Sequence, residues 1–352
     1  MVLSARFKNN GIPSMDLNKT QKLTIKQLNL KIENNEYVFE KLNCLTCNSK
    51  DFQTLSEKSR YGVIMHVVIC KNCGLVQTNP RMTKDSLYKF YENEYRKIDQ
   101  GLESPNQEFF LKQYNHGKNI YNYIKQITGK PIKKKFVVEI GTGSGGILQF
   151  FKENDNKVLG LDIDREYIEF GKTKGLNLNV GTIEKISSLD KKPDLIIYSH
   201  VVEHLINPLE DLKKIRNYVN NNSLLYVEVP GIKFLEYSYN QDFLRYLHDA
   251  HTFHYTLTSL KNCMKKAGFD FIAGNEVINS LFKIGRIDEN YENDYDLVIQ
   301  YLQKLERNKM KKFNVNKFKF LIVKNLISIL NLTNTTAIAE SIISKKDNNR
   351  NN

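Results

Sequence analysis

Residues 137–146 decide the fold, and they read VVEIGTGSGG from Val137 to Gly146. The apolar start predicts a buried strand, and the glycines that follow predict a tight turn into a helix, where a ligand can approach the backbone closely. Gly141, Gly143 and Gly146 also satisfy the G-x-G-x-x-G spacing of dinucleotide sites. These residues alone therefore leave a nicotinamide dinucleotide open as the ligand.

Strand-like and helical runs alternate on both sides of this glycine loop. The strand-like runs are Phe136–Ile140, Val158–Asp162, Leu195–Ser199 and Leu224–Val229, and the helical runs are Gly146–Glu153, Glu166–Lys174, Pro208–Val219 and Thr258–Ala267. Such alternation predicts an α/β fold with a doubly wound, mostly parallel sheet and helices on both faces. We assign this domain to residues 131–287. An extension (1–38), a cysteine module (39–98) and a helical linker (99–130) precede it, and a basic helical extension (288–352) follows.

Two carboxylates flank the glycine loop. Glu139 stands two residues before Gly141, where it would repel a pyrophosphate and attract a cationic amino group. The helix amides that follow Gly145 can hold a carboxylate. Asp162 ends the second strand, at about the spacing where a carboxylate accepts both ribose hydroxyls, although NAD enzymes share this feature. The set favours an amino acid joined to adenosine.

Three motifs resemble the class I S-adenosylmethionine (SAM) dependent methyltransferases: E-x-G-x-G-x-G at Glu139–Gly145, G-L-D at Gly160–Asp162 and PDLIIYSHVVEHL at Pro193–Leu205. The resemblance covers residues 131–285 and implies a seven-stranded, Rossmann-like sheet. In that family the final strand is antiparallel and inserted at the edge, with Phe269–Glu276 and Ser280–Ile284 as the last two strands. The resemblance implies SAM as the cofactor and a cofactor site formed by Glu139, Gly141, Thr142, Gly143, Gly145, Asp162, Ile163, Thr182, Ile183 and Ser199.

Four cysteines form two pairs ahead of this domain. Cys44-x-x-Cys47 and Cys70-x-x-Cys73 come close to the spacing of a four-thiolate zinc site, with a slightly longer interval between the pairs. Four thiolates complete a tetrahedral shell, so such a zinc ion is structural. Two disulfides or four buried thiols are the alternatives, and a reducing compartment favours zinc.

The module around these cysteines resembles the N-terminal module of methyltransferases of sugar and surface-polysaccharide biosynthesis. Its Cys-x-x-Cys-Gly-Leu-Val run is followed by Thr78-Asn79-Pro80-Arg81 and Phe90-Tyr91. The resemblance implies a small-molecule substrate, a sugar or nucleotide-sugar. It also implies that Arg81, Tyr88 and Tyr91 lie near the substrate, with simple packing as the alternative for the tyrosines.

Five of the seven histidines fall into two clusters, His200/His204 and His248/His251/His254. The first follows the fourth strand, where ligands bind in open α/β sheets. His204 or His200 is a candidate general base, oriented by Glu203. Alternatively, His200, Glu203, His204 and His251 hold a divalent metal, because RNA 2′-O- and quinone-type O-methyltransferases look similar here, with E-x-x-E-H where this chain has H-x-x-E-H. Histidines with purely structural hydrogen bonds are the third possibility.

The charge pattern bears on partners and location. The chain has a net charge of +13, yet residues 131–275 carry 19 Lys and Arg against 18 Asp and Glu, which argues against a general nucleic-acid surface. Lysines and aromatic residues between 304 and 324 suit either a docked helix or peripheral contact with an anionic membrane. The sequence shows neither a long apolar segment nor a secretory signal, so we expect a cytoplasmic protein.

The non-enzymatic alternative is a SAM-binding or partner-recruiting module.

Overall fold

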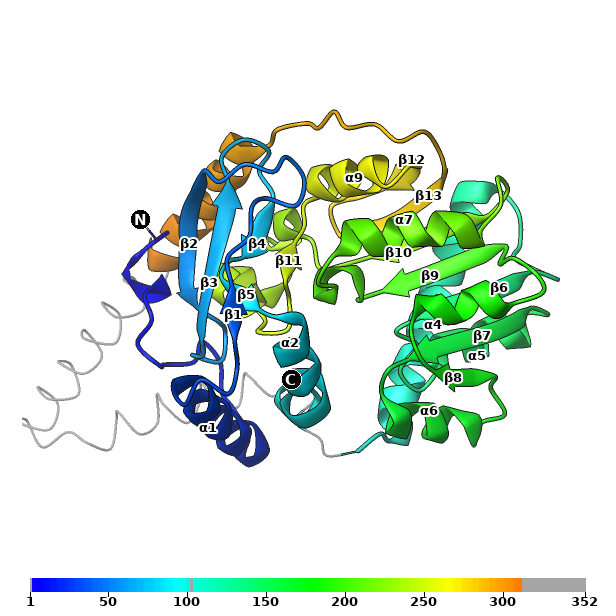
Figure 1. Ribbon diagram of the computed structural model, residues 1–352, viewed down its shortest axis with the longest axis horizontal. Coiled ribbons are helices and arrows are strands. Elements are labelled where there is room, and N and C mark those ends of the chain that lie inside the picture. Colours follow the sequence, from blue (N-terminus) through cyan, green and yellow to red (C-terminus); the bar gives the residue numbers. More distant parts are fainter. Residues whose placement is uncertain (1, 100, 102–103, 312–352) are drawn as a thin grey trace, which may run out of the picture. The chain divides into compact units, whose positions relative to one another are not determined.

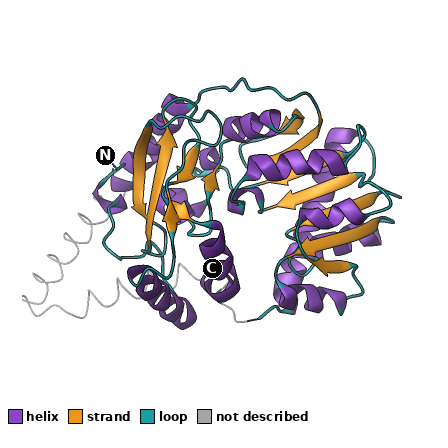
Figure 2. Ribbon diagram, in the orientation of Figure 1, coloured by secondary structure: helices purple, strands orange, loops and turns teal. Residues whose placement is uncertain are grey.

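The computed structural model describes residues 2–99, 101 and 104–311. Residues 1–302 form one compact unit, and residues 303–352 form a second. Figure 1 follows the chain through these parts, and Figure 2 separates helices from strands. The expected basic segment 304–324 lies largely outside the described residues. Within the described part, no helix is both long and apolar enough to cross a membrane.

A seven-stranded sheet forms the second half of the first unit. Its strands run in the order β12-β13-β10-β9-β6-β7-β8, and β13 is antiparallel to both of its neighbours. The other pairings are parallel. The predicted fold class is therefore confirmed, including the antiparallel strand next to the sheet edge. The strands are β6 (Phe136–Ile140), β7 (Lys157–Asp162), β8 (Leu178–Val180), β9 (Leu195–Ser199), β10 (Leu224–Glu228), β12 (Phe269–Gly274) and β13 (Asn279–Ile284).

Helices cover both faces of this sheet (Figure 2). Successive strand residues point to opposite faces, so Val137 packs with one helical layer while Val138 packs with the other. The layer on the side of Val137 contains α4 (Gln107–Thr128), α5 (Gly146–Glu153) and α6 (Arg165–Lys172). The opposite layer contains α7 (Pro208–Tyr218) and α9 (Leu257–Lys266). Because β6, β7, β9 and β10 are parallel, their carboxyl ends lie along the same edge of the sheet.

The cysteine module is built around a second, antiparallel sheet with the order β11-β4-β3-β2. Its strands are β2 (Phe52–Lys58), β3 (Ile64–Cys70), β4 (Val76–Thr78) and β11 (Phe253–His254), and a small pair is formed by β1 (Phe39–Glu40) and β5 (Arg81–Met82). The accompanying helices are α1 (Lys19–Glu33), α2 (Lys84–Phe90), a π-helix at Tyr91–Tyr95 and α3 (Arg96–Asp99).

Strand β11 belongs to the second sheet, although it lies far from β2–β4 in the sequence. It follows the segment 229–252, which is inserted after β10 and in which α8 (Phe243–Tyr246) is the one α-helix assigned. Phe253 pairs with Gln77, and Thr78 N–H donates to the Thr252 carbonyl at 2.9 Å. The insertion also packs on the start of the chain, where Arg245 Nε donates to the Ser14 carbonyl at 3.0 Å. The cysteine module therefore holds the loop that carries His248 and His251.

Candidate functional site

The glycine loop between β6 and α5 is held tightly against its neighbours. Gly141 and Thr142 donate their N–H groups to the Leu161 carbonyl of β7, at 2.7 and 3.1 Å. Gly141 has a φ of +70°, and a Cβ built there would come within 2.3 Å of Val201. The loop therefore requires glycine at this position, because the neighbouring strand end leaves no room for a side chain.

Two buried carboxylates lie beside the loop, as the sequence predicts. Glu139 is 1% exposed and accepts a hydrogen bond from the Thr142 hydroxyl at 2.7 Å. Burial raises its pKa well above the ordinary value, and Thr142 offsets this only in part. A cation brought next to Glu139 would favour its ionised form. The amino group of a bound amino acid is such a cation.

Asp162 ends β7 and organises the other side of the loop. Its two oxygens accept the N–H groups of Gly143 and Asp164 at 2.7 and 2.9 Å. Burial raises its pKa, and the nearby Arg96 guanidinium acts in the opposite direction. Each carboxylate oxygen has a second lone pair, so Asp162 can still accept hydrogen bonds from the hydroxyl groups of a ligand.

Two residues outside the loop complete this half of the site. Arg96 of α3 pairs with Asp164 at 3.3 Å, and its guanidinium lies 4.3 Å from the centre of the Tyr167 ring. Gln113 of α4 donates to the Thr142 carbonyl at 3.1 Å and accepts from the Ser144 hydroxyl at 2.7 Å. Sequence reasoning missed both, because neither belongs to a motif.

The remaining expected cofactor residues differ in their surroundings. Ile163 directly follows Asp162 and is 46% exposed, whereas Ile183 is 4% exposed and packs in the core below the sheet edge. Thr182 is exposed and donates its hydroxyl to Glu184. Ser199 ends β9 and is buried. Ile163 is thus an accessible apolar residue beside the loop.

A first polar cluster lies where β9 and β10 end. Glu228 of β10 accepts hydrogen bonds from the Ser199 hydroxyl at 3.1 Å and the Tyr226 hydroxyl at 3.2 Å. His116 Nε2 of α4 lies 2.7 Å from the same carboxylate, and His200 Nε2 lies 3.8 Å from its other oxygen. His116, His200 and Glu228 are close enough to share one metal ion.

A second cluster contains the other expected catalytic residues. Glu203, His204 and His251 present ligand atoms that all lie within 4.8 Å of one another. The Glu203 side chain is 2% exposed, and its Oε1 lies 3.9 Å from His204 Nε2. Its carboxylate has no hydrogen-bond partner among the described residues. The structure thus brings together three of the four predicted residues and places His200 in the first cluster, although Glu203 Oε1 lies only 3.5 Å from His200 Nδ1.

The two key histidines have opposite electrostatic surroundings. Burial alone would lower the pKa of His200, but the carboxylates of Glu203 and Glu228 outweigh it and raise that pKa to about 9. Burial lowers the pKa of His204, and Glu203 offsets this only in part. At neutral pH, His200 is therefore an imidazolium and His204 a neutral imidazole. His200 is also the more accessible of the two, because half of its side chain is exposed.

The hydrogen bonds of His204 indicate its tautomer. Its Nδ1 lies 3.2 Å from the Ala250 carbonyl, which can only accept, and 2.8 Å from the Tyr91 hydroxyl. This assigns the proton to Nδ1 and leaves a lone pair on Nε2, beside Glu203. The Tyr91 contact also brings the cysteine module to the site, where the sequence predicts that tyrosine.

The four cysteines converge as the sequence predicts. Cys44 Sγ lies 3.4 Å from Cys73 Sγ, Cys47 Sγ lies 3.4 Å from Cys70 Sγ, and all four thiols are free. All four sulfur atoms lie within 4.8 Å of one another. A tetrahedral Zn²⁺ with bonds of about 2.3 Å places its sulfur ligands roughly 3.8 Å apart, so the quartet fits this ion.

Comparison with protein families gives one match. Residues 114–273 match the family model described as a methyltransferase domain. The match includes the glycine loop, both carboxylates and both polar clusters. The chain therefore carries a methyltransferase domain. A search of curated proteins found no match.

Several solved structures are similar to part of the chain. A SAM-dependent methyltransferase from Archaeoglobus fulgidus is 23% identical, with a TM-score of 0.38, over 57% of this chain and 92% of that one. The plantazolicin methyltransferase BamL, solved with a triazolic desmethylPZN analog and SAH, is 19% identical, with a TM-score of 0.39, over 58% and 80%. A SAM-dependent methyltransferase from Clostridium acetobutylicum is 12% identical, with a TM-score of 0.37, over 56% and 99%. The family model and the strand order of the sheet support a methyltransferase domain, and these distant structural likenesses add no further argument.

Proposed function

We propose that this SAM-dependent methyltransferase methylates a small polar acceptor, a sugar or nucleotide-sugar, at the end of the sheet where β9 and β10 meet. The observation that carries the proposal is the pair of adjacent polar clusters around Glu203 and Glu228, beside the glycine loop. Ser199, His116 and His200 offer several hydrogen-bonding groups there. Such a surface suits an acceptor with several hydroxyl groups better than an apolar one.

The cofactor residues have distinct roles in this proposal. Glu139 binds the amino group of SAM. The N–H groups at the start of α5 donate hydrogen bonds to the carboxylate of SAM. Asp162 accepts hydrogen bonds from the ribose hydroxyl groups, and Ile163 contributes an apolar surface for the adenine. Bound SAM supplies an electrophilic methyl group, so the chain's own residues mainly align the acceptor with it, which can remove roughly 7–11 kcal/mol of barrier.

His204 is the base of the proposed reaction. The lone pair on Nε2 can take the proton of an acceptor hydroxyl when the methyl group passes from the sulfonium sulfur, which leaves as a neutral thioether, to the hydroxyl oxygen. The neighbouring Glu203 carboxylate, 3.9 Å away, then stabilises the imidazolium that forms. His200 is already an imidazolium at neutral pH, so we assign it to binding an acceptor oxygen. The Ala250 carbonyl keeps the His204 proton on Nδ1, and the Tyr91 hydroxyl can accept a hydrogen bond from the same N–H group.

A panel experiment tests the acceptor class. The purified chain is incubated with methyl-labelled SAM and separate pools of nucleotide-sugars, quinols and RNAs, and the labelled product is identified by mass spectrometry. Label in a nucleotide-sugar supports the proposal, and its loss in His204→Ala supports the assigned base. Label only in the quinol or RNA pool would show that the acceptor class is wrong.

A metal-assisted O-methyltransferase that acts on RNA or a quinone-type acceptor is the second candidate. The specific observation that favours it is the Glu203 carboxylate, which is buried without a hydrogen-bond partner among the described residues and lies near His204 and His251. Such a set can bind a divalent cation that polarises an acceptor oxygen. Mn²⁺ titration followed by electron paramagnetic resonance tests this candidate. Binding that disappears in His251→Ala would favour it over a metal-free base.

We also propose that the cysteine quartet binds one structural Zn²⁺. Cys44, Cys70 and Cys73 are buried, so no open coordination position faces a substrate. The ion would fix the two turns that flank β2, β3 and β4. Metal analysis of the purified chain should then give one zinc per chain, and an absence of zinc after purification without chelators would count against this role.

A further inference from the structure

An apolar cavity lies in the N-terminal part of the chain, and its lining includes His251 of the second polar cluster. Its volume is about 270 Å³, close to the lower end of the range for pockets that bind small organic molecules. It is lined by residues from α1, β1, β3, β4, β5 and α2, and by the loop at 249–252. None of the lining residues belongs to the glycine loop.

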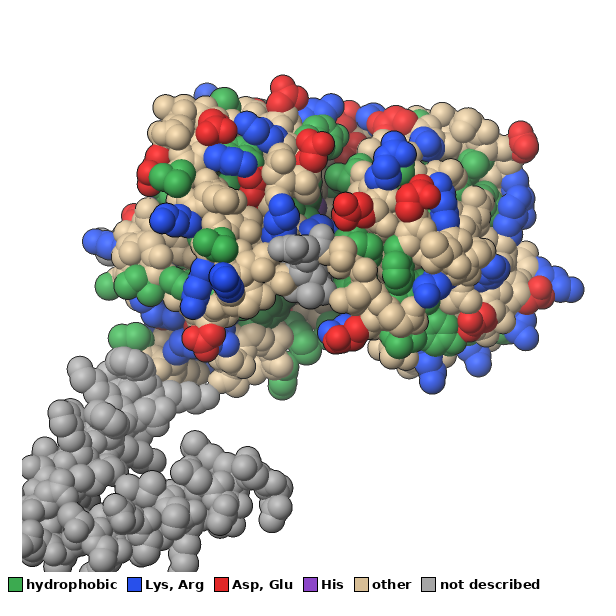
Figure 3. Space-filling model, turned by 90° about the horizontal axis from the view of Figure 1, so that it is seen from below, with side chains coloured by type: hydrophobic (Ala, Val, Ile, Leu, Met, Phe, Trp, Pro, Cys, Tyr) green, Lys and Arg blue, Asp and Glu red, His purple; other side chains and the backbone are tan. Residues whose placement is uncertain are grey.

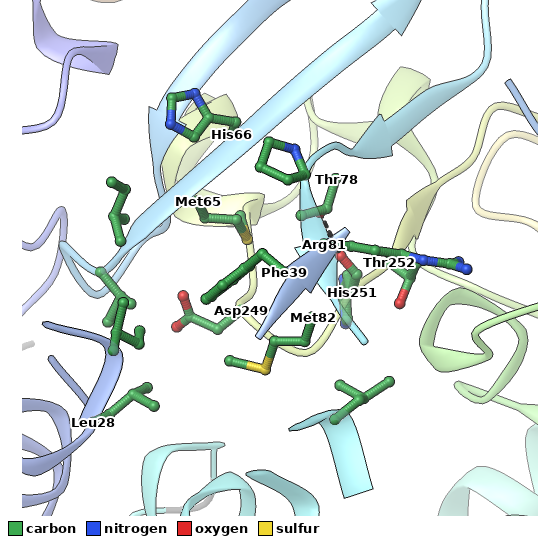
Figure 4. Close-up of a pocket in the computed structure, with 15 residues that line it drawn as sticks. Leu28, Phe39, Met65, His66, Thr78, Arg81, Met82, Asp249, His251 and Thr252 are labelled. Carbon is green, nitrogen blue, oxygen red and sulfur yellow. Dashed lines mark hydrogen bonds between the residues drawn. The ribbon is translucent and has the colours of Figure 1, made fainter. Parts of the chain in front are cut away.

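The walls of this cavity are mainly hydrocarbon and thioether groups. Figure 4 shows Leu28, Phe39, Met65 and Met82 around it. Flexible methionine side chains adapt to the shape of an apolar ligand. The cavity therefore suits the apolar body of a molecule.

The rim of the cavity is also apolar. Phe39 and Ile64 line the cavity and are 36% and 41% exposed, and the adjacent Val38 is 56% exposed. Exposed apolar residues that gather at one place often mark a binding site. A ligand with an apolar body could thus enter from solvent between Phe39 and Ile64.

Two polar groups inside the cavity lack partners. Both oxygens of Asp249 and Nδ1 of His251 are buried without a hydrogen bond to any described residue. Figure 4 shows the Asp249 carboxylate among the side chains of Phe39, Met82 and Leu28. The Ser59 side chain and the Arg60 guanidinium also lie near this carboxylate. A buried carboxyl group whose hydrogen-bonding capacity is not filled is unfavourable, so a ligand that donates hydrogen bonds to it would relieve that cost.

We propose that this cavity binds an amphiphilic amine, with its apolar body against Phe39, Met65 and Met82 and its nitrogen hydrogen-bonded to Asp249. An ammonium group offers several donors to the two carboxylate oxygens and brings the opposite charge. An alcohol offers a single donor without charge. An amphiphilic carboxylate would be repelled by Asp249. The order of affinity is therefore amine, then alcohol, then carboxylate.

The composition of the chain offers a direct reporter for this site. The sequence contains no tryptophan, so Ile64→Trp places a single indole at the cavity rim. The reporter variant is titrated with n-octylamine, n-octanol and octanoate while its emission is recorded. Calorimetry with the unaltered chain provides a second measurement that does not depend on the indole. We expect octylamine to bind at least about tenfold more tightly than octanol.

The role of Asp249 is tested in the reporter background. Asp249→Asn should weaken octylamine binding by about tenfold and leave octanol binding nearly unchanged, because the charge is lost and the apolar walls remain. Retained octanol binding also shows that the cavity is still folded. Asp190→Asn, at an exposed position in the loop before β9, is the matched control and should change neither affinity.

Two results would overturn the proposal: no saturable binding of octylamine by either method, or equal affinities for octylamine and octanol in the unaltered chain. Incubation with methyl-labelled SAM then tells whether the amine is an acceptor. Labelled octylamine makes the cavity part of the acceptor site, and binding without label makes it a separate ligand site. Neither readout of binding depends on methyl transfer, so failure of the proposed function would be recognised separately.

Discussion

Replacing Glu203 by Gln removes the charge that the structure places nearest to His200. Glu203 Oε1 lies 3.5 Å from His200 Nδ1, while Glu228, at 3.8 Å, stays in place. At 3.5 Å, Coulomb's law gives about 1.2 kcal/mol in bulk water and about 4.7 kcal/mol at an effective dielectric constant of roughly 20. Because half of the His200 side chain is exposed, we expect a value near the lower limit.

The pKa of His200, about 9 in the unaltered chain, should therefore fall by roughly one unit in Glu203→Gln. Two-dimensional NMR of the imidazole resonances, titrated between neutral and alkaline pH, measures this change, with His200→Asn to assign the signal. Glu166→Gln, on the exposed face of α6, is the matched control and should leave the titration unchanged. A His200 pKa that moves by less than about half a unit would show that the assigned electrostatics are wrong.

The same pair affects stability in a defined pH window. The folded state holds the His200 proton more tightly than the unfolded state does, because the pKa rises from 6.5 to about 9. The resulting stabilisation is fully present below pH 6.5 and is lost as the pH rises through about 9. Denaturant unfolding at both ends of this window should show a smaller change in Glu203→Gln than in the unaltered chain.

Three further predictions concern the cofactor, the base and the metal. Glu139→Gln should weaken SAM binding about tenfold or more in calorimetry, because a charged hydrogen-bond acceptor becomes neutral; an unchanged affinity would exclude Glu139 as the partner of the amino group. His204→Ala should reduce turnover by about 10²–10⁴-fold and leave SAM affinity intact, and undiminished turnover would exclude it as the base. Cys70→Ser should remove the zinc found by metal analysis and lower the melting temperature; retention of stoichiometric zinc would contradict the four-thiolate site.

The sequence predicts the sheet domain well because its signals are local. The strands at 136–140 and 195–199 and the helix at 146–153 have the predicted bounds, since buried apolar runs end there at glycine or polar residues. The four cysteines converge because each pair forms a short turn and the antiparallel pairing of β2 with β3 brings the two turns together. Both features need only short stretches of chain to be recognised.

The rest of the site could not be predicted, because it depends on contacts between distant residues. His116 lies on a long amphipathic helix, where a single histidine gives no pattern, yet it meets Glu228 across 112 residues. Arg96 comes before the predicted domain and still reaches Asp164. The two-residue strand β11 exists because β4 offers it an edge. Only the folded chain shows which of these residues meet.

The pairing of β11 with β4 limits how this protein can be divided. A shortened chain that starts at residue 114 would keep every residue that matches the methyltransferase family and lose the strand that holds Phe253 and His254. The exposed edge and the apolar surface beneath it would favour aggregation. Amide hydrogen exchange around residues 249–254 should accordingly speed up when the proposed Zn²⁺ is removed from the cysteine quartet. The order of the loop that carries His248 and His251 would then depend on zinc supply.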